Sequence, residues 1–117
     1  MLNLARKDTL WPKQMSQVEI ERSVRKLATH PRPRKFVLMK LKRSPVIGIY
    51  DCYGMTYGPG GREVTHIGVV PVFTSSKFHG AEANILTTTI EWIIEATPET
   101  IRSALDEWCE AHVRAPF

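Results

Sequence analysis

The chain has 117 residues, of which 43% are hydrophobic and 24% are charged, and its formal net charge is +4. The length is that of one ordinary domain, so we expect a single domain over residues 1–117, and the composition excludes a disordered chain. The two cysteines, Cys52 and Cys109, are too few for a secreted disulfide scaffold, and no apolar run suits a signal peptide or a membrane span. These features predict a cytoplasmic protein with two buried thiols and no membrane partner.

The positive charge is concentrated in the first third of the chain. Residues 1–44 hold 12 lysines and arginines against three acids, whereas residues 45–117 hold four against nine. Such asymmetry indicates an acidic partner for the first part of the chain. An equally weighted alternative is that the two parts face each other, within one fold or across a dimer.

The first predicted elements are an arm and a helix. Residues 1–15 form the arm, because Trp11-Pro12 disfavours helical backbone, and Trp11 is expected to dock on the core or on a partner. Ser16 and Glu19 fit a capping box that opens a helix, which the prolines after His30 should end. Apolar residues recur along it at helical spacing and Arg22, Arg25 and Lys26 share its other face.

Four strands are predicted next, over 36–42, 46–53, 63–73 and 85–95. Val37 and Met39 oppose Phe36 on the first strand, and the glycine-rich loop at 58–61 separates the second strand from the third. The segment 85–95 fits a helix as well as a strand, but three consecutive threonines are stiff at χ1 and favour a strand.

Thr97 and Pro98 then begin a C-terminal helix, with the threonine as cap and the proline at the first helical position. The predicted fold class is therefore α+β: a mainly antiparallel four-stranded sheet with an N-terminal and a C-terminal helix, in the order α-β-β-β-β-α. Both sheet faces are fairly apolar, so the second face must be buried by the arm, by sheet curvature or by another subunit. A homodimer through that face is one consequence.

The strongest functional signal is the run of basic residues from the first helix into the first strand. Cations around an aromatic ring can hold phosphates while a base stacks, although a solvated surface explains the same charges. No helix-turn-helix, zinc-finger or ribonucleoprotein motif accompanies the run. The predicted binding residues are Arg22, Arg25, Lys26, Arg34, Phe36, Lys40 and Lys42.

Signals for catalysis are weak. The histidines show no metal-ligand spacing, so no metal or cofactor is predicted. Cys52 and His66 could meet on neighbouring strands, but a cysteine in a strand is usually a small buried hydrophobe. No catalytic residue is therefore assigned, and the sequence favours a non-enzymatic protein.

The preferred interpretation is a small binding or accessory protein that contacts an acidic protein or a nucleic acid through a basic N-terminal surface. One alternative is a small-molecule site or weak enzyme with a pocket between sheet and helices, lined by Tyr50, Asp51, His66 and Trp92. Another is a contact through the acidic C-terminal helix, which would use Asp106, Glu107 and Glu110.

Overall fold

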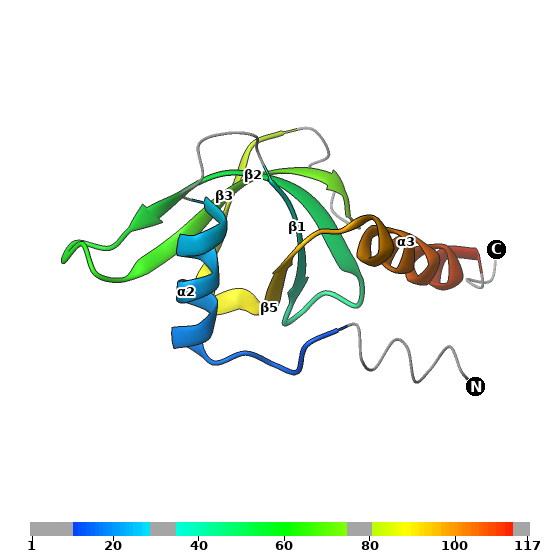
Figure 1. Cartoon of the computed structure of the whole chain (residues 1–117), viewed down its shortest axis with the longest axis horizontal. Helices are drawn as coiled ribbons and strands as arrows, with labels where there is room; N and C mark the ends of the chain where they lie inside the picture. The colour runs from blue at the N-terminus through cyan, green and yellow to red at the C-terminus, as the bar shows by residue number, and fades with distance from the viewer. Residues whose placement is uncertain (1–10, 29–34, 75–80, 114–117) are drawn as a thin grey trace.

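The computed structural model describes residues 11–28, 35–74 and 81–113 (Figure 1). Its elements in chain order are α2 (Gln17–Ala28), β1 (Lys35–Leu41), β2 (Ile47–Tyr57), β3 (Val64–Phe73), β4 (Ala83–Leu86), the 3-10 turn η1 (Thr87–Thr89), β5 (Ile90–Glu95) and α3 (Pro98–Val113). The fold is α+β, as predicted. No helix in these ranges is long and apolar enough to cross a membrane.

Both helices begin where the sequence places their caps. Ser16 Oγ accepts the backbone N–H of Glu19 at 3.2 Å, and Glu19 Oε1 accepts the backbone N–H of Ser16 at 3.0 Å. These hydrogen bonds hold the pKa of the Glu19 carboxyl below its ordinary value. At α3, Thr97 Oγ1 accepts the N–H of Thr100 at 3.1 Å, and Thr100 Oγ1 accepts the N–H of Thr97 at 2.8 Å. Each cap satisfies backbone donors that the first helical turn leaves open.

The sheet has five strands, in the order β4-β3-β2-β1-β5, and every neighbouring pair is antiparallel. The prediction of four strands was wrong because the segment 85–95 is interrupted at the threonines. Thr87 Oγ1 donates to Val64 O at 2.8 Å, and Thr89 Oγ1 donates to Leu86 O at 2.7 Å. Threonine hydroxyls that bond to backbone carbonyls compete with the strand ladder, and here they stabilise a 3-10 turn.

The placement of η1 forces the sheet to curve. In a flat sheet of this order the edge strands β4 and β5 would lie about 19 Å apart, at about 4.8 Å per strand. A three-residue 3-10 turn joins them, and such a turn rises only about 2 Å per residue. The sheet therefore curls into a partly closed barrel, and the long β2–β3 hairpin extends beyond its end (Figure 1).

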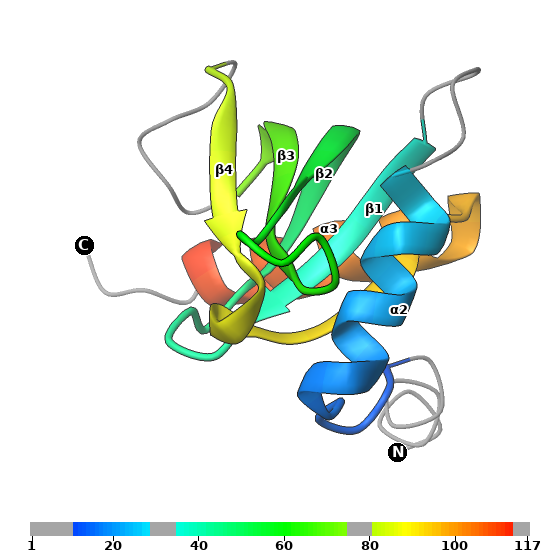
Figure 2. The same ribbon diagram turned by 90° about the vertical axis from the view of Figure 1, so that its left-hand side faces the viewer.

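The helices cover opposite faces of this curved sheet (Figure 2). On the concave face, Ile20, Val24 and Leu27 of α2 pack against buried residues from β1, β2, β3 and β5. On the convex face, Ala104 of α3 packs against Leu38, Ile49 and Trp92, with Trp11 and Phe73 beside them. The predicted alternation of side chains between the two sheet faces along β1 is thus confirmed.

Part of the second sheet face is buried within the chain itself, although Phe36 on it is exposed. Trp11 stacks on Trp92 with ring centroids 5.5 Å apart, and Phe73 meets Trp108 edge to face at 4.6 Å. The arm therefore docks on the core through Trp11, and the sheet face does not by itself require a second copy. One prediction about the cysteines was wrong: Cys52 is buried, but Cys109 is exposed on α3.

Candidate functional site

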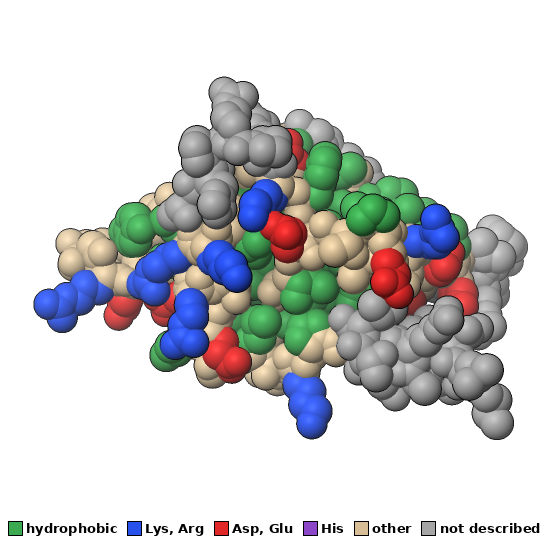
Figure 3. Space-filling view, viewed as in Figure 1, with side chains coloured by type: hydrophobic (Ala, Val, Ile, Leu, Met, Phe, Trp, Pro, Cys, Tyr) green, Lys and Arg blue, Asp and Glu red, His purple; other side chains and the backbone are tan. Residues whose placement is uncertain are grey.

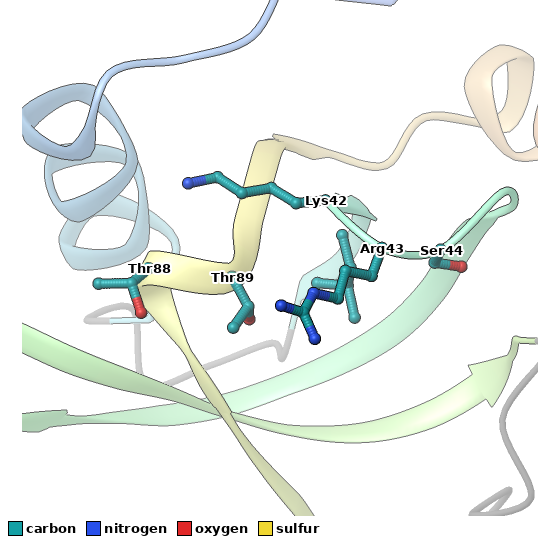
Figure 4. Close-up of a pocket in the computed structure, with 6 residues that line it drawn as sticks. Lys42, Arg43, Ser44, Thr88 and Thr89 are labelled. Carbon is teal, nitrogen blue, oxygen red and sulfur yellow. The ribbon is translucent and has the colours of Figure 1, made fainter.

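The candidate site is a groove at one end of the barrel, with a cavity volume of about 690 Å³. It lies between the turn that joins β1 to β2 and the 3-10 turn η1. Its described lining residues are Leu41, Lys42, Arg43, Ser44, Thr88 and Thr89. In Figure 4 the side chains of Lys42 and Arg43 extend on the side of Thr88 and Thr89, whereas the Ser44 hydroxyl points away.

Hydrogen bonds fix the backbone on both sides of this groove. The N–H of Ser44 donates to Leu41 O at 3.1 Å, which closes the turn, and the N–H of Lys42 donates to Thr89 O at 2.9 Å, which joins the turn to η1. Ser44 Oγ also donates to Val46 O at 3.1 Å. The backbones that carry Lys42 and Thr88 are therefore held in a fixed relation to one another.

The side chain of Lys40 stabilises the same turn by hydrogen bonds. Its Nζ donates to Ser44 O at 2.7 Å and to Leu41 O at 3.1 Å, and it lies 3.7 Å from Glu91 Oε1. The charge of Lys40 is thus matched by Glu91. Lys42 and Arg43 are exposed and make no ion pair with any residue that the structure describes. The groove consequently carries two unmatched positive charges.

The predicted binding residues lie on several separate surfaces. Arg22 and Lys26 are exposed on α2, whereas Arg25 bonds to the backbone oxygen of Arg62 and lies 3.8 Å from Glu21. Phe36 is 48% exposed, on the convex face of β1. Since a strand rises about 3.3 Å per residue, Phe36 lies about 20 Å along the chain from Lys42. Arg34 lies outside the described residues.

The four residues of the predicted pocket do not converge. Tyr50 is buried in the concave core, and burial raises the pKa of its phenol to about 12. Asp51 follows it and points to the opposite face. Trp92 is buried under Trp11 on the convex side. His66 Nδ1 lies 2.9 Å from Thr65 Oγ1 on β3, and His66 is paired with Thr56, five positions along β2 from Asp51.

The residues considered for catalysis or metal binding are also apart. Cys52 belongs to the concave core, and burial raises the pKa of its thiol. His66 follows the outward side of β3, because its neighbour Ile67 packs into the concave core. No group of three potential metal ligands occurs among the residues that the structure describes.

On the acidic helix, the contacts favour a structural role for one carboxylate. Glu107 Oε2 accepts the indole N–H of Trp11, so it helps to dock the arm. Asp106 and Glu110 are exposed. The three acids therefore do not form one free surface.

Part of the groove was missed by sequence reasoning. Arg43 belongs to the basic run, but Ser44, Thr88 and Thr89 carried no functional signal on their own. The turn at Ser44-Pro45 and the run of three threonines are far apart in sequence, and only the curvature of the sheet brings them together. No family model, curated protein or solved structure matches this chain.

Proposed function

We propose that this protein is a non-enzymatic binding protein that contacts an acidic macromolecule through cations of its N-terminal third. The observation that carries the proposal is the division of those cations. Lys35 and Lys40 lie 2.7 and 3.7 Å from Glu95 and Glu91. Five others are exposed and make no ion pair among the described residues: Lys13, Arg22, Lys26, Lys42 and Arg43. Of these, Arg22 still acts through its charge on the Glu19 carboxylate.

The visible face of the molecule carries cations over more than one element. In Figure 3, lysine and arginine side chains lie over α2 and toward the end of the β2–β3 hairpin, with acidic side chains among them. A net charge of +4 adds a general attraction for an acidic partner and speeds its approach. The dispersed pocket residues give no comparable support for an enzyme.

The proposal is tested by measuring association with labelled DNA, labelled RNA and poly-glutamate at low and rising salt. We expect binding to at least one of them, with an affinity that falls steeply with salt. The test variant carries Arg22→Glu, Lys26→Glu, Lys42→Glu and Arg43→Glu, and should lose that binding.

A charge control uses cations outside the proposed set. Arg62→Glu with Arg102→Glu changes exposed residues of the hairpin and of α3, and should retain most of the affinity, whereas Lys42→Glu with Arg43→Glu makes the same charge change within the set. An absence of binding to all three polymers at low salt would refute the proposed function. Equal losses in the two double variants would show a nonspecific charge effect and would also refute it.

A further inference from the structure

We propose that the groove between the 41–44 turn and η1 is a phosphate-binding site for the backbone of a nucleic acid. Lys42 and Arg43 would bind the phosphate charge, and the Thr88 hydroxyl would donate a hydrogen bond. This inference rests on the proposed function and assigns the partner's chemical class and the place where it binds.

The first argument is preorganisation. The turn is closed by the bond from Ser44 N to Leu41 O and is tied to η1 by the bond from Lys42 N to Thr89 O. Lys40 Nζ donates to the same Leu41 carbonyl and to Ser44 O. The backbone of the site is therefore already ordered, and only the side chains of Lys42, Arg43 and Thr88 lose freedom when a ligand arrives, so less ordering cost opposes binding.

The second argument is the set of donors. An arginine presents a planar fork of N–H groups, a lysine a compact ammonium, and a threonine a rotatable hydroxyl. Thr88 is exposed, and its hydroxyl makes no hydrogen bond to the described residues, whereas the hydroxyls of Thr87 and Thr89 are bonded to backbone carbonyls. Each of the two charged oxygens of a backbone phosphodiester can accept more than one hydrogen bond, so these three donors can be satisfied by the phosphates of a nucleic-acid strand.

The third argument concerns what the groove lacks. Its described lining contains no acid and no aromatic residue. Without an aromatic platform, bases are not stacked here, and backbone contacts carry no sequence information. The groove should therefore bind nucleic acid with little dependence on base sequence. The exposed ring of Phe36 lies on the convex sheet face and is not part of this site.

The experiment measures the anisotropy of a fluorescent single-stranded oligonucleotide, about 12 nucleotides long and at about 20 mM salt, where electrostatic binding is strong. The groove variant is Lys42→Ala with Arg43→Ala. Its matched control is Arg62→Ala with Arg102→Ala, which removes the same charge from residues outside the proposed set. All four side chains are exposed, so both variants should fold.

We expect the groove variant to bind about tenfold or more weakly and to lower the slope of log affinity against log salt by about 1.4, since each phosphate contact on a single strand contributes about 0.7. The Arg62→Ala with Arg102→Ala control should weaken binding by about threefold or less, because its cations lie outside the groove and act at a distance. Thr88→Val should weaken binding severalfold without changing the salt slope.

Three outcomes would overturn the inference, and they separate it from the proposed function. If a variant with Arg22→Ala and Lys26→Ala loses binding and the groove variant does not, the groove assignment fails but the proposed function stands. If poly-glutamate binds more tightly than the oligonucleotide at equal charge, and the groove variant abolishes that binding, the partner is an acidic protein. If the wild-type protein binds neither polymer, both proposals fail.

Discussion

The indole ring of Trp11 stacks on that of Trp92, with an angle of 15° between the ring planes. Its N–H donates to Glu107, so one arm residue joins β5 and α3. Trp11→Ala should lower the free energy of unfolding by about 2 kcal/mol, because it removes an aromatic stack and leaves Trp92 partly uncovered. Urea denaturation followed by circular dichroism measures this change.

A conservative variant separates the two contributions of Trp11. Trp11→Phe keeps a ring against Trp92 but removes the donor to Glu107, and should cost about 1 kcal/mol, the usual worth of one hydrogen bond. If Trp11→Ala has no effect on the urea midpoint, the arm does not dock on the core in solution.

Gly48 is required by the ring of Tyr50. A Cβ at position 48 would lie 2.6 Å from Tyr50 Cε1, and that ring is only 5% exposed and has no space to move. Gly48→Ala should therefore destabilise the protein by about 1–3 kcal/mol, as overpacking does. Thermal unfolding followed by circular dichroism is the measurement.

Two other glycines provide controls. A Cβ at Gly68 would lie 2.9 Å from Tyr53 Cε1, but Tyr53 is 39% exposed and can turn away, so Gly68→Ala should cost less. At Gly54 a Cβ would meet nothing within 4 Å, and Gly54→Ala should be neutral or slightly stabilising. Equal losses at positions 48 and 54 would contradict this packing explanation.

Thr87 is the buried first residue of the 3-10 turn η1 between β4 and β5. It is 1% exposed, donates to Val64 O at 2.8 Å and accepts from Gln17 Nε2 at 3.0 Å. Thr87→Val keeps the shape but removes the donor to Val64 O and one of the two acceptors of Gln17 Nε2, which also bonds to Glu21 at 3.3 Å. It should therefore cost about 1–3 kcal/mol in the free energy of unfolding. Thr88→Val, one residue along on the exposed side, should change stability by less than about 0.5 kcal/mol. The reverse order in chemical denaturation would contradict the assignment.

The local features of the fold could be predicted from sequence, whereas the arrangement of β4 and β5 could not. Capping residues such as Ser16 and Thr97 act on neighbours three positions away, so their pattern is visible in the chain. The break at Thr87 depends on Val64 and Gln17, which lie far away in sequence. The register irregularities between β2 and β3 also place Val64 and Val69 on the same face of β3. Strict alternation along the strand would put these two side chains on opposite faces.

The candidate site could be predicted from the sequence only in part, for a related reason. The basic run identifies which residues are cationic, and Lys42 was among the predicted binding residues. Which cations remain unmatched depends on tertiary neighbours: Glu91 lies beside Lys40, and Glu95 beside Lys35, only because β5 pairs with β1. The sequence does not show that η1 forms the other side of the groove, because η1 lies beside the 41–44 turn only in the curved, folded sheet.

Tyr50 should make stability depend on pH at the alkaline end. Its folded-state pKa is raised to about 12 by burial, above the ordinary value of 10.0. A raised pKa stabilises the fold fully below the unfolded-state pKa, and that contribution is lost as pH rises through the folded-state value. Between about pH 10 and 12 the free energy of unfolding should therefore fall by up to about 1.4 kcal/mol per pH unit on account of this group.

The measurement compares urea denaturation across this pH range for the wild type, Tyr50→Phe and Tyr53→Phe. Tyr50→Phe removes the ionisable group and should flatten the decline, whereas Tyr53→Phe should leave the decline unchanged because Tyr50 is still present. The other ionisable groups are common to the wild type and Tyr50→Phe and cancel in the comparison. A decline of equal steepness in Tyr50→Phe would show that the buried phenol does not control alkaline stability.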